Sequence, residues 1–283
     1  MNFSITDLTK NIIPPETFSD ISYDLLNEVV MNIDKVLLQE FIKTLKTNRH
    51  TDLVITGNIG VGKSTICQLL SSLLAFVDNK IKINTYPEYI RLRVEKVKDV
   101  GELMLQLRSD KQISVETFQH FILDFWYMIL AAKDYKSKHL SLYERLPEDS
   151  LYCFAKRSYE NKEISEDGWN RLQRRYNEIK QDFEIFEKKD CVTYRVNNES
   201  SLVNTLSEIM RIVIDQTKNK SNDKSIDKLC DGVGKKVGNS VVDKLYIILE
   251  VKPTIYQQRI KIRNRDSEQT LSTTVLEEYG TFY

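Results

Sequence analysis

The hydrophobic positions of the chain alternate between short apolar runs and longer segments with helical spacing. Five runs have strand character, at 53–56, 81–86, 140–143, 191–196 and 244–250. Helical character extends over 22–45, 66–74, 91–107, 114–132, 164–186 and 201–214. A length of 283 residues suits one α/β domain with additions, or two small domains.

The segment 22–45 precedes the first strand and carries one apolar stripe. It is interpreted either as a helix for a partner or as a helix packed on the main domain, and we favour the second. We therefore divide the chain into an N-terminal extension, 1–50, with one amphipathic helix, and a main domain, 51–283. Residues 217–243 are rich in Lys, Asn, Asp, Ser and Gly, so we expect a flexible loop there.

Composition argues against several classes of partner. Lys plus Arg number 41, as do Asp plus Glu, so the net charge does not indicate nucleic acid or an anionic membrane. No apolar run approaches membrane-spanning length, and the first residues lack signal-peptide character. The cysteines have no C-x-x-C spacing and the histidines share no ligand spacing. We expect a cytoplasmic protein with reduced thiols.

One stretch carries a specific chemical signature. It fits G-x-x-x-x-G-K-[ST], and it reads Gly57-Asn58-Ile59-Gly60-Val61-Gly62-Lys63-Ser64-Thr65. A strand before this loop and a helix after it would aim backbone N–H groups and a helix N-terminus at one phosphate. Lys63 would reach the outer phosphates, and the Ser64 hydroxyl would hold Mg²⁺. The pattern predicts a nucleotide-binding loop, the P-loop.

Charged side chains follow two further predicted strands. Glu88 comes after the strand at 81–86, and Glu144-Arg145, which could also be a surface ion pair, ends the strand at 140–143. The carboxyl ends of parallel strands are where ligands bind in open α/β sheets. Gln119 interrupts the apolar helix at 114–132, where it could face solvent or read a base edge.

The helix that begins at Pro253 carries three arginines, Arg259, Arg263 and Arg265. They could form a solvated face. Beside a P-loop we favour a lid that neutralises phosphoryl charge.

These motifs together resemble the deoxyribonucleoside kinase family, the P-loop enzymes that include deoxycytidine, deoxyguanosine and mitochondrial thymidine kinases. The motifs in family order are the P-loop, Pro87-Glu88, Phe118-Gln119, Tyr143-Glu144-Arg145 with Tyr152-Cys153-Phe154, and the lid arginines. The resemblance spans 51 to about 280. It implies a P-loop kinase fold, with a parallel sheet of four or five strands flanked by helices and an arginine-rich lid.

The resemblance also implies roles for single residues. Glu88 resembles the base that takes the proton of the sugar 5′-hydroxyl, and Arg145 would hold both that carboxylate and the phosphate. Glu144 would join Ser64 at Mg²⁺. The residues that would contact the nucleoside are Gln119 at the base edge, Phe154 stacked on the base, Trp126 and Ser150 beside it, and Glu268 at the 3′-hydroxyl.

Several positions depart from the family pattern. Leu146 replaces the serine of the family's E-R-S, Arg108 the tyrosine that helps to grip the 3′-hydroxyl, and Arg93 a tryptophan. Trp126 and Ser150 occupy the positions where deoxycytidine kinase has an Arg and an Asp that help to select its base. A bulky Trp126 would shrink the pocket, which favours a pyrimidine, thymidine above others.

The order of segments departs as well. In the family a fifth strand and a last helix follow the lid, whereas here 191–196 and 201–214 resemble them and precede it. Either this segment is relocated or 190–216 is an unrelated insertion, and we favour relocation. We expect strands near 83, 141, 54 and 247 in that spatial order, with 192–196 beside the last of them.

The function expected is Mg²⁺- and ATP-dependent phosphorylation of a deoxyribonucleoside at its 5′-hydroxyl. A nucleoside monophosphate kinase of the thymidylate type and a catalytically silent binding or assembly subunit stay open as alternatives. The expected partners are nucleoside and ATP, without nucleic acid or membrane, and a homodimer is left open.

Overall fold

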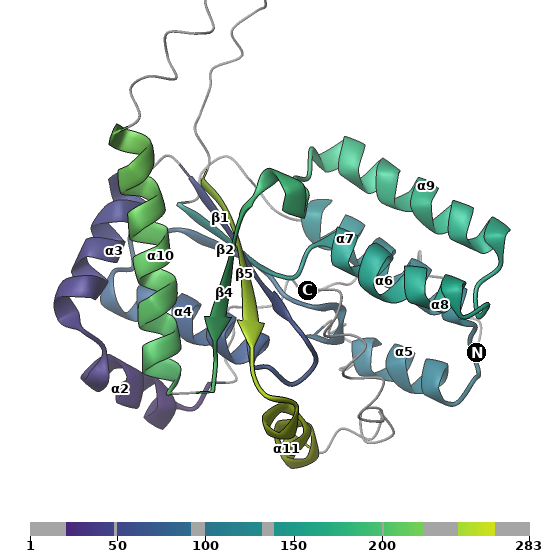
Figure 1. The fold of residues 1–283 in the computed structure, drawn as a ribbon, viewed down its shortest axis with the longest axis horizontal. Coiled ribbons are helices and arrows are strands. Elements are labelled where there is room, and N and C mark those ends of the chain that lie inside the picture. Colours follow the sequence, from purple (N-terminus) through teal and green to yellow (C-terminus); the bar gives the residue numbers. More distant parts are fainter. Residues whose placement is uncertain are drawn as a thin grey trace, which may run out of the picture.

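Five strands form one sheet at the centre of the protein (Figure 1). The structure is a computed structural model, and it describes residues 21–47, 50–91, 100–131, 139–199, 201–222 and 243–263. The strands are β1 (Thr51–Gly57), β2 (Ile83–Tyr86), β3 (Leu140–Glu144), β4 (Val192–Asn197) and β5 (Asp243–Glu250).

The spatial order of the strands is β2-β3-β1-β5-β4, and all four pairings are parallel. This confirms the predicted α/β class and the predicted order of the first four strands. It also confirms the fifth strand, because β4 pairs with β5 from Val192, opposite Leu245, to Asn197, opposite Glu250. The segment 192–197, which precedes β5 in the chain, is therefore part of the sheet rather than a coil on its surface.

Helices cover both faces of the sheet. In Figure 1, α2, α3, α4 and α10 lie on one side and α5 to α9 on the other, with α11 below the ends of β4 and β5. The first group consists of α2 (Tyr23–Asn32), α3 (Lys35–Thr47), α4 (Lys63–Val77) and α10 (Leu202–Asn222). The second group consists of α5 (Val100–Ser109), α6 (Val115–Ala131), α7 (Pro147–Asp149), α8 (Lys156–Glu160) and α9 (Glu166–Phe183), and α11 spans Pro253–Arg263.

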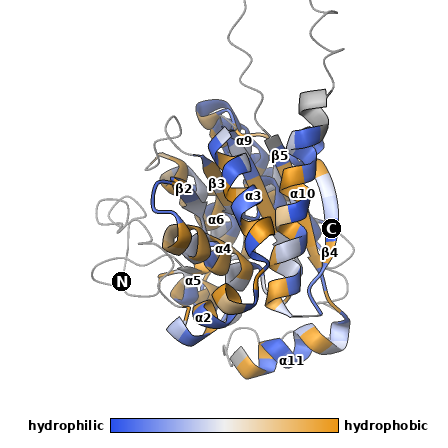
Figure 2. Ribbon diagram, turned by 90° about the vertical axis from the view of Figure 1, so that its left-hand side faces the viewer, coloured by the Kyte–Doolittle hydropathy of each residue, from blue (hydrophilic) through white to orange (hydrophobic). Residues whose placement is uncertain are grey.

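Two apolar layers hold the helices on the sheet. Successive side chains of a strand point to opposite faces, so Leu53 and Ile55 of β1 enter one layer and Val54 the other. All seven residues of β1 are buried, as expected for a central parallel strand. Figure 2 shows α4 and α6 mostly orange, whereas α3 and α9 carry many hydrophilic residues. The central strand thus brings the P-loop out of the best-packed part of the fold.

The N-terminal segment forms two helices, so the prediction of one continuous helix over 22–45 is wrong. Helix α2 ends at Asn32, and Ile33 has extended backbone angles. The Asp34 carboxylate then accepts the N–H groups of Val36 at 2.8 Å and Leu37 at 3.2 Å, which caps the start of α3. A capping side chain interrupts the helix although the apolar spacing continues through it.

The loop predicted at 217–243 also starts later than expected. Helix α10 continues to Asn222, and β5 begins at Asp243. Lys218 forms an ion pair with Glu40 of α3, which ties this end of α10 to the N-terminal helices. The rest of the predicted loop lies outside the described residues.

A substitution in α3 tests whether the N-terminal helices belong to the core. Phe41 is fully buried, whereas Val36 on the same helix is 73% exposed. We expect Phe41→Ala to lower the free energy of unfolding by about 3–5 kcal/mol, because it leaves a cavity between helix and sheet layers. Val36→Ala should change it by no more than about 0.5 kcal/mol. Equally small effects in urea denaturation would mean that α3 contributes little to the folded domain.

Candidate active site

The P-loop leaves the sheet at Gly57 and returns as α4 at Lys63. A Cβ atom on Gly57 would lie 2.5 Å from the Leu249 carbonyl oxygen, and its φ of 132° also requires glycine. Lys63 is buried and folds back over the loop, donating from Nζ to the Asn58 carbonyl oxygen at 3.1 Å. A glycine-rich loop between a strand and a helix N-terminus is the arrangement that P-loops use to surround a phosphate with backbone N–H groups.

Neighbouring strand ends bring the acidic residues to this loop. Tyr86 of β2 and Tyr143 of β3 are paired in register, and their rings stack with centroids 4.3 Å apart. The residues that follow, Pro87-Glu88 and Glu144-Arg145, consequently leave the sheet side by side. The parallel register thus accounts for the meeting of two motifs that lie far apart in the sequence.

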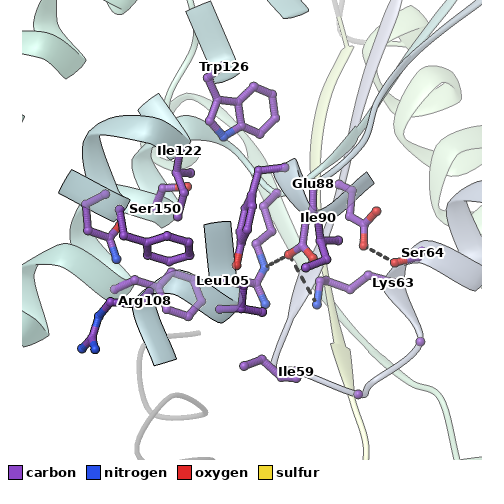
Figure 3. A pocket seen from close by; sticks show the side chains of 18 of the residues that line it. Ile59, Lys63, Ser64, Glu88, Ile90, Leu105, Arg108, Ile122, Trp126 and Ser150 are labelled. Atoms are coloured by element: carbon purple, nitrogen blue, oxygen red, sulfur yellow. Dashed lines mark hydrogen bonds and ion pairs between the residues drawn. The ribbon is translucent and has the colours of Figure 1, made fainter. Parts of the chain in front are cut away.

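Glu88 forms ion pairs with two cations of the site. Its Oε1 lies 2.8 Å from Arg145 Nε and 3.8 Å from Lys63 Nζ. Figure 3 shows Glu88 at the mouth of the P-loop, near Lys63 and Ser64. Because both cations also face the space where a phosphate would sit, a carboxylate here can accept a proton close to a phosphoryl group.

Arg145 connects several parts of the site. Its Nη2 donates to the Gly57 carbonyl oxygen at 2.9 Å, and its guanidinium carbon lies 4.7 Å from the centre of the Phe154 ring. Its φ is 71°, and its backbone N–H donates to the Ile55 carbonyl oxygen at 3.1 Å. A non-glycine residue in this left-handed conformation is uncommon, and here it turns the guanidinium toward Glu88.

The Asp149 carboxylate stabilises the turn that contains Arg145. Its carboxylate accepts from the Leu146 N–H at 2.8 Å and from the Tyr246 hydroxyl of β5 at 2.5 Å. Burial raises the pKa of Asp149, while these two hydrogen bonds act in the opposite direction. The turn that carries Arg145 is thereby tied to the strand on the far side of β1.

Ser64 and Glu144 supply oxygen atoms beside the P-loop. The Ser64 hydroxyl donates to Glu144 Oε1, and Glu144 is buried. Within the described part of the chain, no three His, Cys, Asp or Glu side chains gather into a metal-binding cluster. A hydroxyl and a carboxylate nevertheless fit Mg²⁺, which commonly takes its other ligands from substrate phosphates and water.

A cavity of about 680 Å³ extends from the P-loop to α6 and joins these groups. Its inner wall contains the base-contact residues expected from the sequence, which are Gln119, Trp126, Ser150 and Phe154. Trp126 is only 2% exposed and lies at the end of the cavity remote from Ser64 (Figure 3). An aromatic, mostly apolar chamber with one amide suits a flat heterocycle.

The lid arginines are only partly described. Arg259 lines the cavity, and burial lowers its pKa. It donates to two carbonyl oxygens, those of Val61 at 3.1 Å and Asn198 at 2.9 Å. The side chain of Arg263, and all of Arg265 and Glu268, lie outside the described residues, so their predicted roles stay predictions.

The sequence reasoning did not select some residues that line this cavity. They include Tyr89 and Ile90, which follow Glu88 in the chain, Leu105 of α5, Asn198 directly after β4, and Leu202 at the start of α10. A signal for Asn198 existed, because it directly follows the carboxyl end of a predicted parallel strand. Arg108, which stands where the family has a tyrosine, also lines the cavity, and its Nη2 lies 3.6 Å from Glu163 Oε2.

A comparison with protein-family models decides the family. The model described as deoxynucleoside kinase matches residues 53–203, more than half of the chain. The chain belongs to the deoxynucleoside kinase family. The match runs from β1 through β4 and includes Lys63, Glu88 and Arg145, while β5 and α11 lie beyond it. A search of curated proteins found no match.

As a member of the deoxynucleoside kinase family, the protein is a nucleotide-binding transferase of the kinase type. Of the helices that the structure describes, none is both long and apolar enough to cross a membrane.

The titration of Glu148, next to Asp149, leads to a prediction on how stability depends on pH. Burial raises the pKa of Glu148 from 4.5 to about 7, although the Lys188 N–H donates to its Oε1 at 2.7 Å. Between these two values the folded protein holds a proton that the unfolded chain releases, so the free energy of unfolding falls as pH rises.

Glu148→Gln keeps the oxygen that accepts from Lys188 and removes the titration. We expect the variant to be more stable than wild type at about pH 8. Its free energy of unfolding should not show the fall that the Glu148 titration causes in wild type between about pH 5 and pH 7. Urea denaturation across that range checks it. Parallel stability profiles for the two proteins would contradict the assigned titration.

Proposed function

We propose that this protein transfers the γ-phosphoryl group of ATP, with Mg²⁺, to the 5′-hydroxyl of a deoxyribonucleoside, and that thymidine is its preferred acceptor. The observation that carries the proposal is the position of Glu88. It lies within 3.8 Å of Lys63 at the P-loop and faces the aromatic cavity on the other side. A base at the junction of a phosphate site and a heterocycle site suits transfer from one to the other.

The proposed chemistry assigns each group one task. P-loop N–H groups and Lys63 hold the donor phosphates, so the γ-phosphoryl group points toward the cavity. Glu88 accepts the proton of the 5′-hydroxyl as the oxygen attacks, because an alcohol is a poor nucleophile until its proton is removed. Arg145 keeps the Glu88 carboxylate in place and neutralises phosphoryl charge.

Ser64 and Glu144 would hold the Mg²⁺ ion, which when bound neutralises charge on the phosphate oxygens. Lid arginines, Arg259 among them, would add positive charge over the donor. The acceptor base would lie between Phe154 and the wall formed by Gln119, whose amide can both donate and accept hydrogen bonds.

The preference for thymidine rests on Trp126. Its indole lines the cavity together with Gln119, and its bulk would leave less space for a two-ring purine. Ser150 in the same wall carries no charge to pair with a cytosine amine. An assay of the four deoxyribonucleosides with Mg-ATP tests the proposal, and thymidine should have the highest kcat/KM. Transfer to thymidylate instead of thymidine would favour the monophosphate-kinase alternative.

Glu88→Gln tests the base. The amide keeps the size of the side chain but cannot accept the proton, so we expect single-turnover phosphorylation of thymidine to slow by about a hundred- to ten-thousandfold. Calorimetric affinities for thymidine and ATP should stay within about threefold of wild type. Glu160→Gln, on exposed α8 where Glu160 pairs with Lys156, is the matched control and should be fully active. An equally active Glu88→Gln variant would remove Glu88 from the role of base.

Trp126→Ala tests the acceptor preference. Removing the indole should raise kcat/KM for deoxyadenosine and deoxyguanosine relative to thymidine by about tenfold or more. The control is Trp169→Ala, since Trp169 stacks on Tyr159 at 5.5 Å and does not line the cavity. If both variants keep the wild-type ratio of purine to pyrimidine activity, Trp126 does not set the preference.

A further inference from the structure

Asn198 follows the edge strand β4, yet it contacts the P-loop. It follows β4, and its backbone N–H continues the β4–β5 pairing by donating to the Glu250 carbonyl oxygen at 2.8 Å. The residue is 1% exposed. In Figure 1 the lower ends of β4 and β5 lie next to α11. Asn198 contacts both the P-loop, through Val61, and α11, through Arg259.

Both ends of the Asn198 amide have fixed partners. Nδ2 donates to the Val61 carbonyl oxygen of the P-loop at 2.7 Å, and Oδ1 accepts from the Thr205 hydroxyl of α10 at 2.8 Å. Because the Val61 carbonyl oxygen can only accept, the NH₂ end must face the P-loop, and the Thr205 hydroxyl then donates to the oxygen end and holds it. Arg259 adds a second donor to Val61 O at 3.1 Å and binds the Asn198 carbonyl oxygen at 2.9 Å.

The orientation of the Val61–Gly62 peptide bond links these contacts to the binding of ATP. In a planar trans peptide the C=O and the N–H point in opposite directions. Donors that hold the Val61 carbonyl on the Asn198 side therefore turn the Gly62 N–H away from them, into the loop. Gly62 has a φ of 98° and lines the cavity. Its N–H is one of the donors that a P-loop offers to phosphate.

We propose that Asn198, held by Thr205, is a positioning residue that sets the Val61–Gly62 peptide for phosphate binding before ATP arrives. The inference rests on the proposed function in taking ATP as the ligand of the loop. It also accounts for glycine at position 62, because a Cβ there would lie 2.7 Å from Asn198 Nδ2. The P-loop motif of β1 and α4 thus depends on a side chain contributed by the far edge of the sheet.

Three variants test the inference. Asn198→Asp keeps the shape but places an oxygen, which cannot donate, against the Val61 carbonyl. We expect its affinity for Mg-ATP to fall about ten- to hundredfold, the loss expected when a hydrogen bond to a charged group is misaligned. Thr205→Val removes the hydroxyl that holds the oxygen end of the amide and should weaken Mg-ATP binding about threefold or more, whereas Thr205→Ser should restore it.

The matched control is Thr217→Val at the other end of α10, where the Thr217 hydroxyl donates to the Val213 carbonyl oxygen at 3.0 Å. It should bind Mg-ATP like wild type. In each folded variant, confirmed by thermal unfolding, the affinity for thymidine should be unchanged, and KM for ATP should rise without a matching rise for thymidine. A merely structural role would weaken both ligands together.

The outcomes separate this inference from the proposed function. A folded Asn198→Asp variant with wild-type affinity for Mg-ATP would overturn the positioning role, as would equal losses for ATP and thymidine. A wild type that binds Mg-ATP with the predicted dependence on Asn198, yet phosphorylates no nucleoside, would contradict the proposed function and support the positioning role. A wild type without affinity for Mg-ATP would overturn both.

Discussion

The contact between Arg145 and Glu88 is the interaction on which the rest of the site depends. Arg145 is only 7% exposed, and its guanidinium joins the carboxylate after β2 to the carbonyl oxygen that ends β1. Glu88 is only partly buried, so the pair is held between the protein interior and the cavity, where each charge compensates the other. The pair therefore constrains the geometry of both strand ends at once.

The sheet topology makes this contact possible and gives the site two sides. Adjacent strands β2, β3 and β1 deliver Glu88, Glu144 with Arg145, and the P-loop to one edge. On the other side of β1, strands β5 and β4 deliver α11 and Asn198, which bind the outer surface of the same loop. Both halves of the sheet therefore contribute residues that line the cavity at the P-loop.

Much of this arrangement could be predicted from the sequence. The strand order was predicted from the P-loop pattern together with the family resemblance. The meeting of Lys63, Glu88 and Arg145 follows because the carboxyl ends of parallel strands share one edge of the sheet. The break at Asp34 was not predicted, because the apolar spacing of 22–45 continues through it. The Asp34 carboxylate accepts a backbone N–H group and so starts a new helix there.

Other features depend on contacts that no sequence pattern records. A Cβ on Gly101 of α5 would lie 2.1 Å from the Tyr89 carbonyl oxygen, so this glycine allows α5 to approach the turn after Glu88. Nothing in the spacing of Gly101 indicates that approach. Similarly, the pairing of Asn198 with Val61 follows only from the position of β4 at the sheet edge, a tertiary placement rather than a local preference.

The identity of the phosphorylated oxygen tests the central claim most directly, namely that Glu88 and the P-loop act together on a 5′-hydroxyl. Wild-type protein with Mg-ATP and thymidine should yield thymidine 5′-monophosphate and ADP in equal amounts, identified by phosphorus NMR. 5′-Deoxythymidine, which lacks the attacking oxygen, should yield no phosphorylated product. Phosphate on the 3′-oxygen, or ADP formed without any nucleotide product, would contradict the account.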